Sequence, residues 1–136
     1  MHIDGACLCG GVSYSAEVDP ARVIICHCTD CQTISGGPYR VNVPVLAENF
    51  AVRGEPAVYP KRGGSGETVD TAFCPTCGTA LWSSKGEAPA FFWLRTGAVK
   101  QRAALPPKSQ GFCGSALPWA FDLSGVQRLP EAQPRP

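Results

Sequence analysis

The sequence predicts a single domain built mainly from short β-strands. Its 15 glycines and 13 prolines make up about a fifth of the 136 residues, which favours many turns over long helices. No stretch shows two clear turns of helical periodicity, whereas several short stretches alternate apolar and polar residues. We therefore expect one β domain over residues 1–128 and a disordered tail over residues 129–136, which read LPEAQPRP.

The expected strands follow one another with little helix between them. One helical turn is expected over residues 29–35, and residues 54–56 (Gly-Glu-Pro) predict a hairpin connection. Residues 61–67 have the composition of an exposed loop, and residues 105–109 predict an irregular, proline-rich stretch. Residues 90–95 are apolar on both faces, as in a central strand. The expected strands cover residues 12–18, 22–26, 39–45, 49–53, 57–59, 69–73, 80–83 and 90–95.

Composition and charge exclude several classes of protein. Hydrophobic residues make up 44% and charged residues 17%, which excludes a disordered chain and a highly charged coiled coil. A net charge of +1 predicts no nucleic-acid partner and no anionic membrane. No apolar run approaches the length of a membrane span, and the first eleven residues, MHIDGACLCGG, do not resemble an export signal. We expect a cytoplasmic protein, in which clustered cysteines more often hold metal than form disulfides.

Four of the eight cysteines form two complementary pairs. Cys7 and Cys9 would point to the same side of an extended backbone, and the Cys74-x-x-Cys77 turn is closed by Gly78. Together the pairs predict one tetrahedral four-cysteine zinc site, which would contribute roughly 10 kcal/mol or more to folding. Disulfides and an iron–sulfur cluster are the alternatives, and both are less typical of this spacing in a protein of this kind.

Three more cysteines, Cys26, Cys28 and Cys31, come from one short segment. Three thiolates with no local fourth ligand predict a second metal site with an open position. Because a strand would place His27 on the opposite side from Cys26 and Cys28, we expect a histidine that is packed or hydrogen-bonded near the site.

Two other residues leave alternatives open at this second site. Cys113 lies alone in a glycine-rich segment, and it would close the shell if eight cysteines divide into two sets of four; a free buried cysteine is the other interpretation. Asp30 is either a weak oxygen ligand or, more in keeping with its position, a capping residue of the short helix.

These residues carry a resemblance to a known family. The blocks GACLCGG (residues 5–11), CHCTDCQ (26–32) and FCPTCGTALW (73–82) occur in the order and spacing of the glutathione-dependent formaldehyde-activating enzymes. Ala-Leu-Pro-Trp at residues 116–119 also resembles the C-terminal Pro-Trp of that family. The resemblance therefore covers most of the chain, from Gly5 to about Trp119.

The resemblance implies a fold, a set of metal ligands and an activity. It implies the β-tent fold, small twisted antiparallel sheets around a zinc-ribbon-like four-cysteine site, and a carbon–sulfur lyase activity that condenses formaldehyde with glutathione to S-hydroxymethylglutathione. It implies Cys7, Cys9, Cys74 and Cys77 as structural zinc ligands and Cys26, Cys28 and Cys31 as ligands of the second zinc. This division equals the one that the residues predict by themselves.

The chemistry of a three-thiolate zinc predicts how a thiol substrate reacts. Zinc favours the deprotonated form of a bound thiol, so we expect the glutathione sulfur to occupy the open position, or to displace one cysteine, and to attack the formaldehyde carbon. His27 is available as a proton donor, and Arg40, Arg95 and Lys100 are candidates to pair with the glutathione carboxylates. The alternative hypothesis is a non-catalytic, zinc-stabilised binding module in which both zinc sites are closed.

Overall fold

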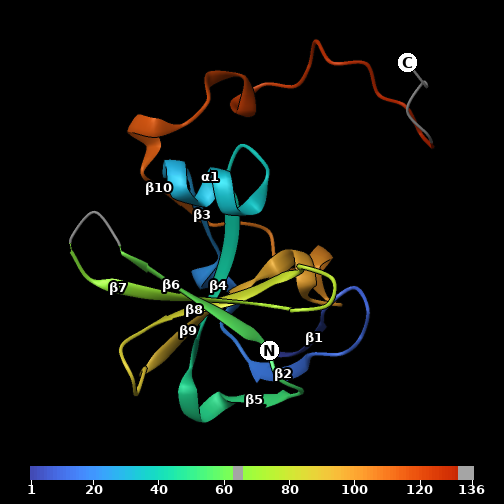
Figure 1. Cartoon of the computed structure of the whole chain (residues 1–136). Helices are drawn as coiled ribbons and strands as arrows, with labels where there is room; N and C mark the ends of the chain where they lie inside the picture. Colours follow the sequence, from blue (N-terminus) through green and yellow to red (C-terminus); the bar gives the residue numbers. More distant parts are fainter. Residues whose placement is uncertain (63–65, 132–136) are drawn as a thin grey trace.

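The computed structural model describes residues 1–62 and 66–131, and within them the chain is mainly β, with two sheets and one α-helix (Figure 1). The strands are β1 (His2–Ala6), β2 (Ser13–Glu17), β3 (Ile24–Cys26), β4 (Arg40–Leu46), β5 (Phe50–Arg53), β6 (Ala57–Arg62), β7 (Thr68–Phe73), β8 (Ala80–Lys85), β9 (Phe91–Arg95) and β10 (Ser109–Gly111); the helix is α1 (Thr29–Ser35). Short 3₁₀ helices occupy Pro20–Arg22, Ala47–Asn49, Thr96–Ala98, Arg102–Ala104, Cys113–Ser115 and Pro118–Phe121.

The smaller sheet has three antiparallel strands in the order β1-β2-β5. Along β2 the burial alternates, and Tyr14 and Ala16 face the core as the period of a strand requires. Tyr14 lies opposite Gly5 of β1, and its ring covers that glycine so closely that a Cβ there would lie 2.1 Å from the ring. Residues 12–18 were predicted as a strand, whereas β1 was not.

The larger sheet has seven strands in the order β10-β3-β4-β9-β8-β7-β6. All neighbours are antiparallel except β10 and β3, which are parallel. The prediction of a central strand over residues 90–95 is confirmed, since β9 is hydrogen-bonded to β4 and β8 on its two sides.

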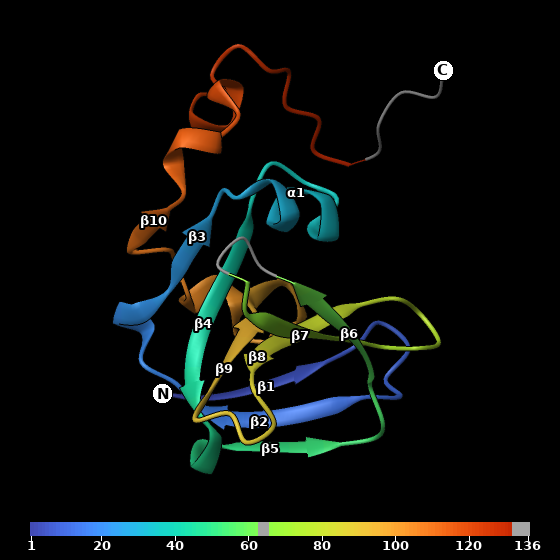
Figure 2. The ribbon, with the colours of Figure 1, turned by 60° about the vertical axis from the view of Figure 1, so that its left-hand side comes forward.

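Both sheets bury their inner faces in one hydrophobic core. Ile3 of β1, Val43 of β4, Leu81 of β8 and Leu94 of β9 are fully buried in it. An aromatic group joins the sheets, because Tyr14 and Phe50 of the smaller sheet pack edge to face on Trp82 of the larger one, with ring centroids 5.9 and 5.1 Å apart. This packing holds the two sheets against each other at the end of the molecule opposite α1 (Figure 2).

Two sequence predictions in the middle of the chain are wrong. Residues 54–56 do not connect a hairpin, because β5 pairs with β2 while β6 pairs with β7 in the other sheet. Gly54 has φ of +88°, and a Cβ on it would lie 2.2 Å from the carbonyl oxygen of Gly11, so the chain turns there against another backbone as it changes sheets. Lys61 and Arg62 belong to β6 rather than to a loop, and residues 63–65 lie outside the described residues.

Helix α1 lies beyond the sheets, at one end of β4 (Figure 2). Cys28 caps its N-terminus by accepting a hydrogen bond from the Cys31 N–H, and Gly36, with φ of +63°, ends it. The predicted strand over residues 22–26 is shorter than expected, because Arg22 ends a 3₁₀ helix and β3 begins at Ile24.

The C-terminal segment contacts α1, because the side-chain amide of Gln32 donates to the carbonyl of Ser115 at 2.8 Å. Residues 105–108 are irregular, as predicted, but Ser109 begins the unpredicted strand β10. The expected tail over residues 129–136 stays a prediction, since residues 132–136 lie outside the described residues.

Candidate metal centres

Two turns on different strands bring four cysteine sulfurs together. Cys7 and Cys9 come from the turn after β1, and Cys74 and Cys77 from the turn between β7 and β8. All four sulfur atoms lie within 4.8 Å of one another, with Cys7 3.5 Å from Cys9 and Cys9 3.6 Å from Cys74. Four thiolates around a zinc ion are separated by about 3.8 Å, and a disulfide needs about 2.05 Å. This four-cysteine cluster therefore has the spacing of a metal site, and all eight cysteines are free thiols.

Backbone hydrogen bonds shape both turns. The Gly10 N–H donates to the Cys7 carbonyl at 3.0 Å, and the Gly78 N–H donates to the Cys74 carbonyl at 2.9 Å. Both glycines have positive φ, +79° and +72°. The prediction that Cys7 and Cys9 lie on extended backbone is thus wrong, because they sit in a turn like the one that carries Cys74 and Cys77. The two sheets have the predicted β-tent arrangement (Figure 1), and this cluster lies in the turns that follow β1 and β7.

In the four-cysteine cluster, the pKa values of neighbouring thiols are shifted in opposite directions. The hydroxyl and N–H of Thr79 hold the pKa of Cys77 down to about 5. The N–H of Gly11 lowers the pKa of Cys9, but the three neighbouring thiols outweigh it and raise the value to about 11. Because the four groups cannot all ionise side by side, the donor set suits a soft divalent cation that neutralises them together.

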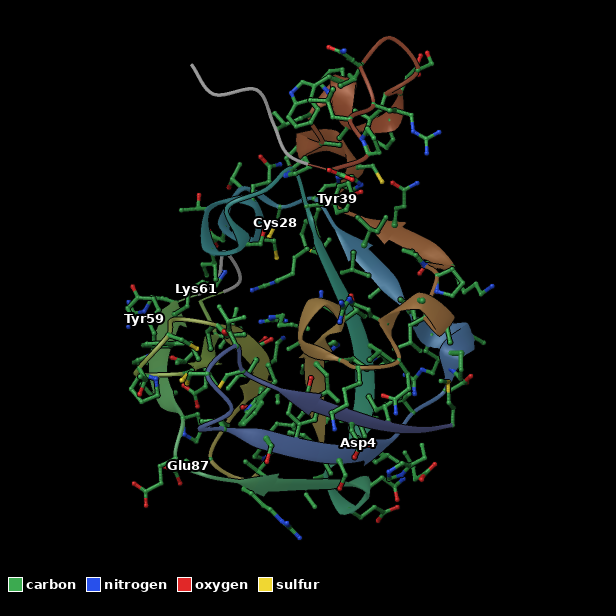
Figure 3. The ribbon with its side chains drawn as sticks, turned by 90° about the vertical axis from the view of Figure 1, so that its right-hand side faces the viewer. Asp4, Cys28, Tyr39, Tyr59, Lys61 and Glu87 are labelled. Atoms are coloured by element: carbon green, nitrogen blue, oxygen red, sulfur yellow. The ribbon has the colours of Figure 1, made fainter. Side chains whose placement is uncertain are left out.

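A second group of sulfurs surrounds the start of α1. Cys26 ends β3, Cys28 is the N-cap, and Cys31 lies buried in the first turn. Their sulfur atoms lie within 4.8 Å of one another, and Cys26 is 3.2 Å from Cys31. Figure 3 shows Cys28 at the α1 end of the molecule, away from the sheet that carries Asp4. This three-cysteine cluster offers three thiolates to a metal ion, with no fourth cysteine in reach.

An arginine from the adjoining strand contacts the three-cysteine cluster. Arg40, the first residue of β4, donates from Nη2 to the sulfur of Cys31 at 2.8 Å. The thiol of Cys31 holds the pKa of Cys26 down to about 5, and the Arg40 charge contributes to this shift. The same proton sharing, together with burial, raises the pKa of Cys31. The thiol of Cys26 therefore ionises more readily than that of Cys31.

A second arginine lies beside the first. Arg95 ends β9 and lies directly opposite Asn42 of β4, so these two side chains are on the same face of the sheet. Arg40 precedes Asn42 by two residues in β4, and its side chain therefore projects from that face as well. The Arg95 side chain is 4% exposed and donates to the Asn42 side chain and to the carbonyl of Trp93. Burial, and then the charge of Arg40, lower the pKa of Arg95 to about 9.

A cavity of about 450 Å³ is lined by residues next to both clusters. Its lining includes Ile34, Arg40 and Arg95 as well as Gly78 and Thr79, which follow Cys77. Both arginines thus border a cavity of the size that small-molecule ligands occupy.

The comparisons with known proteins agree with this geometry. Residues 2–115 match the family model described as glutathione-dependent formaldehyde-activating enzyme. The chain belongs to this family. Over 102 residues it is 26% identical to an uncharacterised lyase of Schizosaccharomyces pombe, and the alignment covers 69% of each protein. A crystal structure of a Rhodobacter sphaeroides protein shares the fold, with a TM-score of 0.61 and 19% identity over 79% of this chain and 98% of that one.

The interpretation of His27 as a packed histidine is confirmed in this member of the formaldehyde-activating family. Its ring is 1% exposed, lies between Tyr39 and Phe121, and bonds through Nε2 to the Gln110 side chain at 2.8 Å. It does not line the cavity that Arg40 and Arg95 border. The hypothesis that His27 donates a proton at the second metal site stays a prediction.

The other candidate residues named in the sequence analysis lie outside the three-cysteine cluster and the cavity that the arginines border. Cys113 is exposed and lies outside the three-cysteine cluster, so it does not close a second four-cysteine shell. Asp30 is in the first turn of α1 and forms an ion pair with Lys61 at 2.5 Å. Lys100 lines a different cavity, beside β1 and β2.

The contact between Arg40 and Cys31 was not predicted, although both residues were noted. Its only signal in the sequence is that Arg40 begins a strand nine residues after the last cysteine of the segment.

Among residues 1–62 and 66–131, no helix is long and apolar enough to cross a membrane.

Proposed function

We propose that this protein is a zinc-dependent enzyme of the carbon–sulfur lyase type that condenses glutathione, or a related thiol, with formaldehyde to S-hydroxymethylglutathione. The observation that carries the proposal is the three-cysteine cluster, which has three thiol ligands, no fourth cysteine and a neighbouring cavity bordered by two arginines. Membership of the family supports the substrate class, and the lyase name of the yeast relative supports the reaction class.

The two clusters have different roles in this proposal. Cys7, Cys9, Cys74 and Cys77 hold a structural zinc, since four thiolates complete a tetrahedral shell. Cys26, Cys28 and Cys31 hold the second zinc, which is more easily lost because only three protein ligands bind it. Zinc bound there lowers the pKa of a substrate thiol, so that a nucleophile is present at neutral pH. The cysteine usage supports a cytoplasmic location.

The reaction itself is an addition to a carbonyl. A lone pair of the substrate thiolate forms the carbon–sulfur bond, the carbonyl π electrons move to oxygen, and that oxygen takes a proton from water. The reverse sequence releases formaldehyde and the thiol. Since this addition also proceeds in water, the protein need only hold the two reactants together, which is worth several kcal/mol.

Arg40 and Arg95 offset the negative charge that a bound substrate thiolate would add at the three-cysteine cluster. Zinc with three thiolates carries a net charge of −1, and a further thiolate beside it makes −2. Arg40 already donates to the sulfur of Cys31, and Arg95 lies next to it, so two positive charges offset this excess.

A non-catalytic binding module with two closed zinc sites is the second candidate. It needs a fourth ligand at the three-cysteine cluster, and Cys113 does not occupy that position. The exposed Cys113 therefore favours the enzyme.

Metal content per chain, measured before and after incubation with excess glutathione and desalting, tests the proposal. Two zincs that fall to one support a thiol-accessible second site. Two zincs that stay bound, together with adduct formation no faster than in buffer, would favour the binding module. The adduct is followed by ¹³C NMR with labelled formaldehyde, and Cys113→Ser is the matched control for serine variants of Cys26, Cys28 and Cys31.

A further inference from the structure

The guanidinium of Arg95 is buried, and two of its three nitrogens have no hydrogen-bond partner. Its Nη1 donates to Asn42 and to the carbonyl of Trp93, whereas Nε and Nη2 have no partner in the structure. These two nitrogens lie on one edge of the guanidinium plane and point their N–H groups in parallel. Because a buried charged donor without a partner is costly, this edge has the properties of a site for an absent acceptor.

Arg40 presents a similar set of unused donors. Its Nη2 donates to the sulfur of Cys31, while Nε and Nη1 are buried and without a partner. Two guanidinium groups side by side repel each other, and within residues 1–62 and 66–131 no carboxylate forms an ion pair with either one. An anion between them would remove this repulsion and satisfy the free N–H groups together.

The cavity that both arginines line has room for such an anion. Its volume is about 450 Å³, and its lining includes Arg40, Arg95 and the buried Thr96. Since Arg40 also contacts Cys31, an anion held by the arginines lies close to the three-cysteine cluster.

We propose that Arg95, assisted by Arg40, binds the carboxylate of the thiol substrate in this cavity, so that the enzyme selects thiols that carry a carboxylate. The parallel Nε and Nη2 donors of Arg95 match the two oxygens of a carboxylate, a geometry that lysine does not offer. This inference rests on the proposed function for the thiol, and on the arginines and the cavity for the anion.

Binding of S-methylglutathione to the zinc-loaded protein by isothermal titration calorimetry tests the inference. This probe keeps both carboxylates, but its sulfur has no proton to lose, so its affinity reports on the cavity rather than on thiolate chemistry. We expect its diethyl ester to bind at least tenfold more weakly. Equal affinities of acid and ester, or no binding of the acid at 10 mM, would overturn the inference. Inorganic phosphate that binds more tightly than the acid would also overturn it, because the site would then select a tetrahedral anion.

Variants of the arginines locate the effect. In Arg95→Lys, which keeps the charge and loses the fork, we expect the preference for acid over ester to fall to less than threefold. Arg53→Gln, at an exposed position of strand β5, is the matched control and keeps the full preference. Retention of the first zinc and an unchanged circular dichroism spectrum report that each variant is folded. A folded Arg95→Lys protein with the full preference would contradict the assignment.

A thiol without a carboxylate separates this inference from the proposed function. If 2-mercaptoethanol forms its formaldehyde adduct in a cysteine-dependent reaction while acid and ester bind equally, only the anion site is wrong. If none of the three cysteines affects adduct formation, the proposed function is wrong, whatever the calorimetry shows.

Discussion

The two clusters both offer cysteine sulfur atoms as ligands, but the residues around those sulfurs differ. The four-cysteine cluster joins two strand-connecting turns of distant sequence, and backbone N–H groups surround its sulfurs. The three-cysteine cluster comes from a single short segment, and a guanidinium and a cavity adjoin it. The two clusters therefore differ in the number and origin of their ligands rather than in the type of ligand.

The largest expected effect is the loss of the four-cysteine cluster. In Cys74→Ser, a buried sulfur that contacts the other turn is removed, and zinc binding in such sites contributes roughly 10 kcal/mol or more to folding. Since this equals the whole stability of an ordinary domain, we expect a protein that does not fold at 37 °C. Thermal unfolding by circular dichroism measures this. A melting temperature within 5 °C of the unchanged protein would contradict the structural role.

The matching change in the other cluster has a different expected outcome. Cys28→Ser keeps an oxygen at the N-cap of α1, so the helix retains its cap while one metal ligand is lost. We expect a folded protein with one zinc per chain and adduct formation at the rate of the buffer. Elemental analysis and ¹³C NMR provide the two readouts, and unfolding of this variant would remove the distinction between the clusters.

A smaller effect comes from the strand that leads into the four-cysteine cluster. In Gly5→Ala the new methyl would lie 2.1 Å from the Tyr14 ring, which is packed against Phe50 and Trp82 and cannot easily move. We expect a loss of about 1–3 kcal/mol in the free energy of unfolding, as is usual for overpacking. Gly97→Ala, beside the cavity and with no atom within 4 Å of its new methyl, is the control and should change stability by less than about 0.5 kcal/mol.

The smallest expected effect is one of reactivity. When the second zinc has been removed and the first retained, Cys26 has a pKa of about 5, because the thiol of Cys31 donates to it. It is therefore ionised above pH 5, and its alkylation by iodoacetamide should change less than twofold between pH 6.5 and 8. Free cysteine, with a pKa near 8.5, should react about tenfold faster per pH unit over most of this range. Mass spectrometry of the labelled peptide containing residues 26–31 measures the rate, and a steep rise with pH would exclude the shift.

The sequence predicted the cysteine groups well, because their spacing alone limits which residues a single ion can bind. It also predicted strands with clear alternation, such as residues 12–18. Strands β1 and β10 were not predicted, since His-Ile-Asp-Gly-Ala and Ser-Gln-Gly contain few residues with high β-propensity and form strands through their neighbours. The expected extended backbone at Cys7 and Cys9 was wrong, although the grouping that it supported agrees with the cluster.

The arginine pair shows what sequence patterns do not contain. Arg40 and Arg95 are 55 residues apart, and they meet only because β4 and β9 pair with Asn42 opposite Arg95. Register between distant strands depends on the packing of the whole core, and no local motif encodes it. The error at residues 54–56 has the same origin, since a short glycine- and proline-containing link fits a hairpin as well as a change of sheet.

The parallel pairing of β10 with β3 has a consequence for the order in which a newly synthesised chain matures. The four-cysteine cluster has all its ligands once Cys77 has left the ribosome. The segment of the three-cysteine cluster gains its full set of backbone hydrogen bonds later. The His27 N–H donates to the carbonyl of Gly111, and the hydroxyl of Ser115 donates to the carbonyl of His27. A nascent chain therefore has the complete four-cysteine cluster well before the three-cysteine segment gains these hydrogen bonds, and a chain truncated before residue 109 would lack β10, the strand that pairs with β3 beside that segment.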